Sequence, residues 1–440
     1  MRLCLTLLVF ICISIFFTGD FISAATNEIS KINPMIEMIQ DKFETNGYLE
    51  NETAHRVNSP HIFPKVQNLF QLETSFNFSD EFSLYGLTWL KYDAAYELDN
   101  YSAEVSREYK TNFKTKDILR ELYVEGSISD LSFRLGRQQV IWGEAVGLKI
   151  TDIINPQDFR EFILDDFIDS RIPLWMLKLE YSLGEYEIEN LFIPDFEPDR
   201  PAETGSEWSI PSSSSYPFKP TSRPDDGFEN MEIGLRLSRF LGGWDISSSY
   251  FYTWDDSPAL HIKEEESEKK VFPEHHRHHT IGFTFNNAFG KWVPQGEFAF
   301  NIGKFFKINE ADIAEGVTRK NNLFYMTGAD YTVNDNLLIN GQFIQEIIFN
   351  HKEGMVDDEI KNIFSIFFQS NFMNETLKPD LLILYDANNG VFLIRPKTVY
   401  DLTDKIKLTL GADIIEGEAK GFIGQFNNND RIYFETKYSF

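Results

Sequence analysis

The last ten residues of the chain, Arg431 to Phe440, read RIYFETKYSF and alternate between apolar and polar side chains. Side chains two residues apart on a β-strand point to the same face, so this segment predicts a strand with one apolar face and one polar face. The apolar face would hold Ile432, Phe434, Thr436, Tyr438 and Phe440, and the other face Tyr433, Glu435, Lys437 and Ser439.

The same alternation recurs in pairs of segments joined by tight turns such as Ser79-Asp80, Asn334-Asp335 and Thr403-Asp404. A period of two interrupted by turn residues predicts β-hairpins. The predicted hairpins pair residues 70–78 with 84–92, 122–128 with 131–135, 175–181 with 186–188, 231–237 with 244–252, 281–285 with 298–302, 323–333 with 337–343, and 392–400 with 406–414.

Long polar segments separate these hairpins, whereas the turns within them are short. Outer-membrane barrels have short periplasmic turns and long extracellular loops, so this sorting predicts an all-β fold, a transmembrane antiparallel β-barrel. About seventeen strand candidates can be counted, and single-chain bacterial barrels have an even number, so we expect sixteen to eighteen strands and a lumen wide enough for water. The long loops would span residues 98–117, 142–171, 194–228, 255–277, 306–320, 349–359 and 417–430.

The N-terminal 25 residues predict a secretory signal peptide. Met1 and Arg2 precede an apolar run from Leu3 to Phe17, and Ser23-Ala24-Ala25 offers a cleavage site. Both cysteines, Cys4 and Cys12, lie inside this segment, so the mature chain would hold no disulfide. Residues 26–64, polar and with one helix-like stretch over 36–43, are expected to form a periplasmic extension or a plug, and residues 65–440 the barrel.

The composition excludes several classes of function. A formal net charge of −27 at pH 7 makes nucleic acid an unsuitable partner. The sequence has no Gly-rich phosphate loop and no His-Glu-x-x-His motif. Gln369-Ser370-Asn371 is similar to the serine segment of outer-membrane phospholipase, but Phe368 stands where that enzyme has its histidine base, so we expect no enzyme activity and no cofactor.

A pore constriction is predicted around residues 142–171, which stop alternating and carry many charges. A loop that folds into a barrel narrows the pore, and acids facing bases there sort solutes by charge. The alternative is an ordinary extracellular loop with solvated charges. Acidic residues would raise the local cation concentration, so we expect a cation preference. The candidate residues are Arg134, Arg137, Glu144, Asp158, Arg160, Asp165, Asp166, Asp169 and Arg171, and Arg236 also falls on a polar strand face.

Four of the eight histidines lie within residues 275–279. Neighbouring histidines can bind Zn²⁺ or Cu²⁺, but consecutive residues of a strand point to opposite faces. Only His276 and His278, or His275 and His279 with distortion, could then share an ion. We therefore expect a solvated loop edge and no metal site, with His276 and His278 as the weak alternative.

Two resemblances specify the class of barrel. The segment Gly136-Arg137-Gln138 leads to Trp142-Gly143-Glu144, then to Asn155-Pro156, and Gly205-Ser206-Glu207-Trp208 follows; this series resembles a motif of a family of uncharacterised Gram-negative outer-membrane barrels. The terminal strand is similar to those of chains inserted by the bacterial barrel-assembly machinery, with Phe440, Tyr438 and Phe434 as the assembly signal.

The resemblances imply a pore-like protein of the cell outer membrane. Its expected partners are outer-membrane lipids, lipopolysaccharide, the barrel-assembly machinery and small solutes, and the oligomeric state stays open. We expect passive passage of small solutes. The alternatives are a channel for hydrophobic compounds, with residues 26–64 as part of a hatch, and a surface adhesin or structural barrel.

Overall fold

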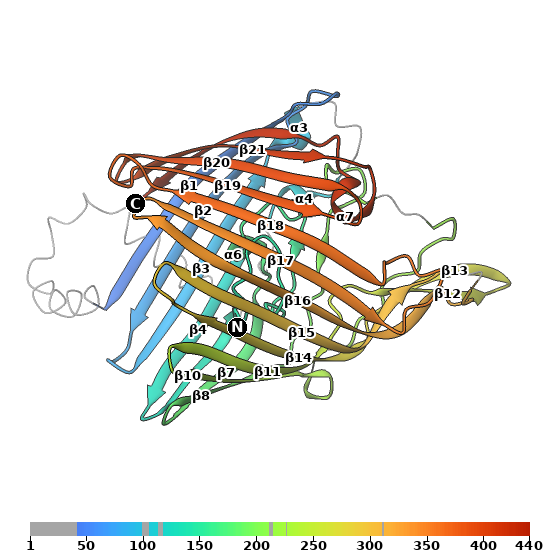
Figure 1. The fold of residues 1–440 in the computed structure, drawn as a ribbon, viewed down its shortest axis with the longest axis horizontal. Helices are drawn as coiled ribbons and strands as arrows, with labels where there is room; N and C mark the ends of the chain where they lie inside the picture. The colour runs from blue at the N-terminus through green and yellow to red at the C-terminus, as the bar shows by residue number, and fades with distance from the viewer. Residues whose placement is uncertain (1–41, 99–104, 113–117, 211–213, 226, 310–311) are drawn as a thin grey trace, which may run out of the picture.

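The computed structural model describes residues 42–98, 105–112, 118–210, 214–225, 227–309 and 312–440. Eighteen strands form one antiparallel sheet that closes into a barrel, as Figure 1 shows. The first strand closes the ring because it pairs with the second strand on one side and with the last strand on the other. The predicted all-β barrel and its strand number are confirmed.

The barrel strands follow one another in chain order around the ring. They are β1 (Phe43–Arg56), β2 (Lys65–Asn77), β3 (Phe82–Asp93), β4 (Leu119–Ile128), β5 (Leu131–Gln138), β7 (Leu174–Leu183), β8 (Tyr186–Ile193), β10 (Glu232–Leu241), β11 (Trp244–Trp254), β14 (Arg277–Asn287), β15 (Trp292–Lys307), β16 (Val317–Asn334), β17 (Leu337–Phe349), β18 (Ile360–Ser370), β19 (Leu377–Asp386), β20 (Val391–Thr403), β21 (Ile406–Glu416) and β22 (Arg431–Ser439).

The remaining elements are short and belong to the connections. They are α3 (Ala95–Leu98), α4 (Arg107–Lys110), β6 (Asp158–Phe159), α6 (Phe167–Ser170), β9 (Arg200–Pro201), η1 (Phe228–Asn230), the hairpin β12 (Ala259–Glu265) and β13 (Glu268–Glu274), and α7 (Gly421–Gly424). In the described part of the chain, no helix combines the length and the apolar character needed to cross a lipid bilayer.

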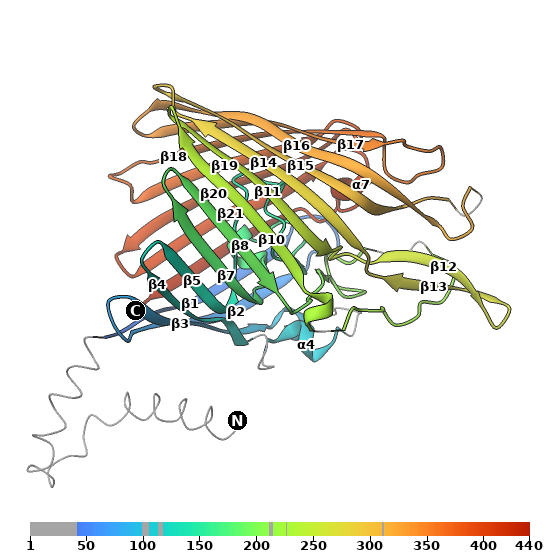
Figure 2. The same ribbon diagram turned by 90° about the horizontal axis from the view of Figure 1, so that it is seen from below.

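The connections are tight at one rim and long at the other. Gly242 and Gly243 alone join β10 to β11, and both have a positive φ (59° and 89°), which a two-residue hairpin turn requires and glycine adopts without strain. At the opposite rim, residues 139–173 join β5 to β7, and the hairpin β12–β13 projects well beyond the barrel in Figures 1 and 2. The predicted division into tight turns and long loops is confirmed.

The outer surface of the barrel is apolar. In β10, Ile233, Leu235 and Leu237 are each about two-fifths exposed, whereas Glu232, the first residue of the strand, is 3% exposed and faces inward. Phe434, Tyr438 and Phe440 are similarly exposed on β22 and beyond its end. Side chains of this kind suit contact with hydrocarbon, and inward polar side chains suit contact with water.

The barrel begins earlier than the sequence suggested. Residues 43–56, assigned above to a polar extension or plug, form β1 and therefore belong to the barrel. The apolar period is weak in this strand, where Leu49 is the one large aliphatic side chain exposed on the outer surface; backbone pairing with β2 and β22 supplies what the pattern lacks. The proposed signal peptide and most of the helix-like stretch lie outside the described residues.

Candidate channel lumen and constriction

The loop between β5 and β7, residues 139–173, enters the lumen, and Asn155 holds its two ends together. The side-chain oxygen of Asn155 accepts a hydrogen bond from the backbone N–H of Val140 (2.7 Å), and its amide nitrogen donates to the carbonyl of Ile172 (2.9 Å). Trp142 donates its indole N–H to Glu189 of β8. The two ends of the loop are thus tied to each other and to the wall.

Glu297 of β15 fixes the next part of the loop. Its carboxylate accepts hydrogen bonds from the backbone N–H groups of Glu144, Ala145 (2.7 Å) and Thr151 (3.1 Å) and from the hydroxyl of Thr151 (2.8 Å). Glu297 is only 3% exposed. A buried carboxylate needs such donors, so this residue and residues 144–151 depend on each other.

Three apolar clusters follow the loop across the inside of the barrel. Trp142 and Ile154 pack against Phe251 and the strands β7 and β8; Ala145 and Ile150 pack against β15, β16 and β17; and Phe162 and Leu164 pack against β19, β20 and β21. A surface loop could not contact strands so widely separated around the ring. The loop therefore folds inward, which decides between the two alternatives that the sequence left open.

The residues of the family-like motif hold this loop in place. Trp142 and Asn155 hold the two ends of the loop, as described above. Trp208, from the loop between β8 and β10, is 2% exposed and stacks on Phe162 with 5.9 Å between ring centroids. Glu207 beside it forms an ion pair with Arg56 of β1 (3.5 Å). The motif is thus a set of structural contacts within the lumen.

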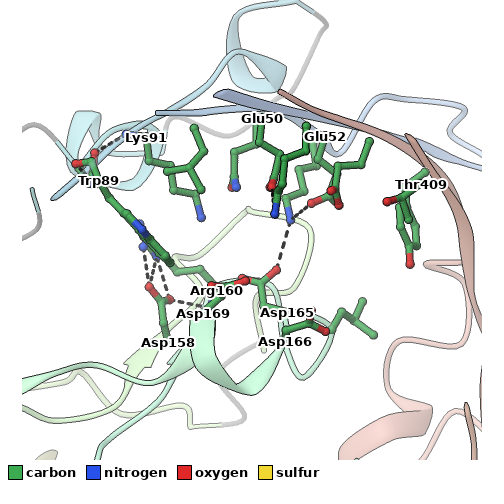
Figure 3. Close-up of a pocket in the computed structure, with 18 of the residues that line it drawn as sticks. Glu50, Glu52, Trp89, Lys91, Asp158, Arg160, Asp165, Asp166, Asp169 and Thr409 are labelled. Carbon is green, nitrogen blue, oxygen red and sulfur yellow. Dashed lines mark hydrogen bonds and ion pairs between the residues drawn. The ribbon is translucent and has the colours of Figure 1, made fainter. Parts of the chain in front are cut away.

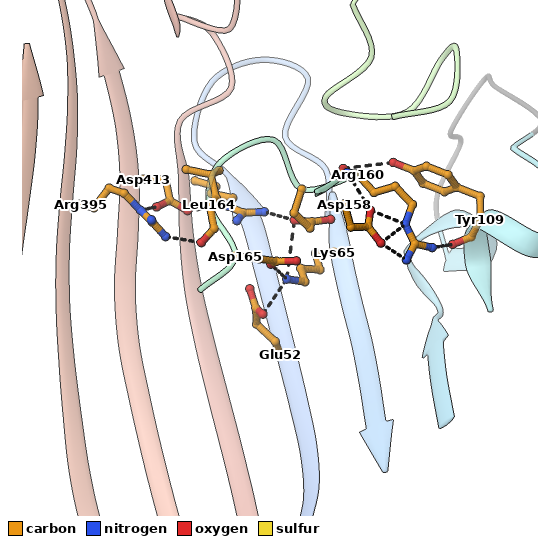
Figure 4. Close-up of polar contacts among 11 residues, drawn as sticks. Glu52, Lys65, Tyr109, Asp158, Arg160, Leu164, Asp165, Arg395 and Asp413 are labelled. Atoms are coloured by element: carbon orange, nitrogen blue, oxygen red, sulfur yellow. Dashed lines mark hydrogen bonds and ion pairs between the residues drawn. The ribbon is translucent and has the colours of Figure 1, made fainter. Parts of the chain in front are cut away.

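Acids of the loop meet bases of the wall, as Figure 4 shows. Lys65 of β2 is 1% exposed and lies 3.2 Å from Asp165, 3.6 Å from Glu161 and 2.7 Å from Glu52 of β1. Arg431 of β22 pairs with the same Glu161 (2.8 Å). Buried charges of opposite sign satisfy one another here, and the pairs fix the position of the loop tip.

Further bases of the wall bind the loop or its partners. Arg395 of β20 pairs with Asp413 (2.7 Å) and donates to the carbonyl of Leu164. Arg120 of β4 donates to the carbonyls of Ile168 (2.9 Å) and Asp169 (2.6 Å). The loop is therefore held by side chains from both sides of the β1–β22 seam.

A cavity of about 330 Å³ lies between the loop and the wall strands β1–β5 and β20–β22. Figure 3 shows Glu50, Glu52 and Lys91 directed into it from the wall and Asp165 and Asp169 from the loop. The residues that line it include eleven lysines and arginines but seven aspartates and glutamates, a formal excess of four positive charges. Glu161 and Asp413, which pair with lining bases, reduce the excess from four to two, so this cavity is moderately basic although the whole chain is strongly acidic.

The structure brings together six of the nine residues predicted for a constriction. Arg137, Asp158, Arg160, Asp165, Asp166 and Asp169 all line this cavity. The other three lie elsewhere: Arg134 pairs with Glu125 (2.9 Å), Glu144 lines a separate small pocket beside Arg236, and Arg171 pairs with the buried Asp152 (2.7 Å).

Arg134 and Arg137 are three residues apart and would face opposite sides of a regular strand. Gly136 between them has a φ of 142°, and a Cβ there would lie 2.2 Å from the carbonyl oxygen of Leu122. The register with β4 and β7 continues without a shift, yet Arg137 is 6% exposed and lines the cavity, where the strand pattern alone would place it with the exposed Leu135.

The loop acids differ in their electrostatic surroundings. Burial opposes the ionisation of Asp158, but the charge and the hydrogen bonds of Arg160 lower the pKa of that carboxyl well below its usual range. Burial, and then the neighbouring Asp165, raise the pKa of Asp169 to about 6. Asp169 therefore changes its charge in the range between pH 5 and 7, and Asp158 does not.

The histidine cluster is divided by the fold. His278 of β14 is 8% exposed and lines a second lumen cavity of about 310 Å³. His276 lies instead against His261 of β12, with 2.7 Å between the two Nε2 atoms. The suggested pair of His276 and His278 is therefore wrong, because His276 precedes β14 and its ring turns to the projecting hairpin.

Sequence reasoning missed the residues that position the loop. Glu297, Lys65, Arg395 and Arg431 all lie on strands, at inward positions of an alternating pattern. The signal that the sequence offered for these residues was a charged side chain on the polar face of a predicted strand. It did not specify a role, because many other charges occupy equivalent positions and the partners on the loop are 96 or more residues away in the chain.

Comparisons with known proteins agree with the fold. The crystal structure of OccAB4 of Acinetobacter baumannii superposes with a TM-score of 0.52 at 10% identity, over 91% of this chain and 98% of that one. OccK8 (OprE) of Pseudomonas aeruginosa gives the same values. OpdK of Pseudomonas aeruginosa, solved with vanillate, gives 0.51 at 8% identity, over 91% and 99%. At such identities the likeness concerns the fold, which is that of outer-membrane porin barrels.

The sequence comparisons are less informative about activity. No curated protein matches the sequence. A family model described as "Protein of unknown function (DUF1302)" matches residues 47–440, which include nearly all of the barrel.

Proposed function

The chain belongs to the family described as protein of unknown function (DUF1302), and we propose that it is a passive outer-membrane channel for small solutes that carry an anionic group such as a carboxylate. The observation that carries the proposal is the basic cavity under the inward loop. Bases that outnumber acids on a low-dielectric wall raise the local concentration of anions.

The constriction is assigned to five residues that line two cavities at once. The basic cavity and a third cavity, of about 360 Å³, share Asp165 and Asp166 on the loop and Arg395, Lys397 and Tyr433 on the wall. A solute that passes from one cavity to the other would cross between these groups. Acids on one side and bases on the other orient a solute that carries both a charge and an apolar body.

The cation preference expected from the loop acids has no support in this arrangement. Asp165 faces Lys65 at 3.2 Å and Asp158 faces Arg160 at 2.5 Å, so the charge of both acids is compensated. Lys91 and Lys407 also line the cavity. The balance of charge therefore favours anions, and the direction of selectivity is the property to measure.

Single channels in planar bilayers test the proposal. In a salt gradient, the reversal potential of the parent channel should indicate a preference for anions, and the combined substitution Lys91→Gln, Lys397→Gln and Lys407→Gln should reduce it. Lys420→Gln, on an exposed loop, serves as the control and should change little because salt screens exposed charges within about 8 Å.

Solute uptake provides a second measurement. Vanillate, the aromatic carboxylate bound to OpdK, can be compared in liposome swelling with vanillyl alcohol, which lacks the carboxylate. The carboxylate should enter faster through the parent and lose its advantage in the triple variant. Absence of conductance steps would favour the adhesin alternative, and a cation preference of the parent would refute the proposed solute class.

A further inference from the structure

The hairpin β12–β13 carries a cluster of potential metal ligands outside the lumen. His261 lies opposite Phe272 in the register, and Glu274 lies two residues beyond Phe272, so the side chains of His261 and Glu274 share one face of the hairpin. His276 follows in the short segment that leads into β14. One ligand atom of each residue lies within 4.8 Å of the corresponding atoms of the other two.

The two imidazoles meet in an arrangement that suits a shared ion. Their Nε2 atoms are 2.7 Å apart and the ring planes are inclined by 59°. Without an ion, this contact requires one Nε2 to carry a proton and the other to accept it. With an ion, both nitrogens would act as acceptors, in the neutral state in which histidine binds metals.

We propose that His261, Glu274 and His276 bind a divalent transition-metal ion, for which Zn²⁺ is the probe of choice. Two nitrogens and a carboxylate oxygen are a ligand set that Zn²⁺ accepts, with bonds of about 2.0–2.2 Å. Two ligands of a tetrahedral zinc ion lie about 3.3 Å apart, so the Nε2 atoms would separate by a few tenths of an ångström. Water would complete the coordination.

Neighbouring side chains already orient the ligands. Glu315, in the loop between β15 and β16, places Oε2 at 3.9 Å from the other ring nitrogen of His261, Nδ1. Phe305 of β15 stacks on the ring of His276 with centroids 4.1 Å apart. The stacking on Phe305 fixes the direction of the His276 ring, whereas the carboxylate of Glu315 is too far from Nδ1 for a hydrogen bond and contributes only electrostatic attraction.

The carboxylate of Glu274 retains capacity for an ion although Lys263 lies 2.5 Å from its Oε1. A carboxylate has two oxygens with several lone pairs, so an ammonium and a metal ion can be bound together. The three ligands come from both strands of the hairpin and from the segment at its root. A bound ion would therefore fasten the hairpin to the rim of the barrel.

Calorimetry on the full-length mature protein tests the site. Protein without a polyhistidine tag is treated with a chelator, kept in detergent and titrated with Zn²⁺. One equivalent should bind, and His276→Gln should weaken binding about 100-fold or more, because loss of a ligand costs at least as much as loss of an orienting contact. Glu315→Gln removes only an exposed charge 3.9 Å from His261, so it should weaken binding far less than His276→Gln does.

Controls separate a built site from adventitious chelation. His279→Gln changes a histidine of the same cluster whose ring contacts Tyr250, so it should leave zinc binding unchanged. Heat-dependent gel mobility reports whether each variant has folded. X-ray absorption of the zinc-loaded parent should show two imidazole nitrogens and a carboxylate oxygen around the ion. Failure of the parent to bind zinc, or equal losses in His276→Gln and His279→Gln, would overturn the proposal.

Discussion

The substitution Glu297→Gln should release the inner part of the loop between β5 and β7. Each carboxylate oxygen of Glu297 accepts two hydrogen bonds from residues 144–151, and glutamine replaces one of these oxygens with an N–H donor. Two charge-assisted bonds of about 1.5–3 kcal/mol each are then lost, so the local attachment weakens by about 3–6 kcal/mol. This is more than a 100-fold change in the ratio of attached to released loop.

Two measurements follow the release of the loop. Open-channel noise in planar bilayers should increase, and limited proteolysis should cleave within residues 144–151 of the variant but not of the parent. Glu346→Gln is the matched control, because this inward carboxylate of β17 accepts from Asn322 of the neighbouring strand (2.8 Å) and not from the loop. If the Glu297 and Glu346 variants behaved alike in both assays, Glu297 would not anchor the loop.

Two further predictions concern pH and assembly. Because the pKa of Asp169 is raised to about 6, lowering the pH from 7 to 5 should neutralise it and increase the anion preference, as reversal potentials would record; Asp169→Asn should reduce this dependence, and a variant that kept all of it would contradict the raised pKa. Phe440 exchanges backbone hydrogen bonds with Gly47 (3.0 and 3.3 Å) and stacks on Phe70 (6.2 Å), so Phe440→Asp should impair assembly, scored by heat-dependent gel mobility, far more than Ser439→Asp; equal losses would argue against this role of the terminal aromatic.

Local alternation was sufficient to predict most strands and the class of fold. The side-chain period of two survives in any single strand, so segments such as 231–237 and 432–440 were recognisable without knowledge of their partners. The tight turns and the long loops then indicated which ends of the hairpins lie together at the same rim of the barrel. Alternation did not reveal β1, because its side chains are mostly polar on both faces. Its place in the barrel depends instead on backbone pairing with β2 near the start of the chain and with β22 at its end.

The sequence by itself determined a barrel with an apolar exterior, a charged loop and a strongly acidic composition. Only the tertiary structure decided that the loop folds inward, that Lys65, Arg395 and Arg431 meet it there, and that His261 joins His276. His261 and His276 are 15 residues apart and meet through the pairing of one hairpin. The contacts of Lys65, Arg395 and Arg431 with the loop instead link residues 96 or more apart in the chain, and the ring closure chooses which of many similar charges become neighbours. For the same reason an acidic chain can enclose a basic cavity: charge composition is summed over all residues, whereas the local field depends on the few that face one cavity.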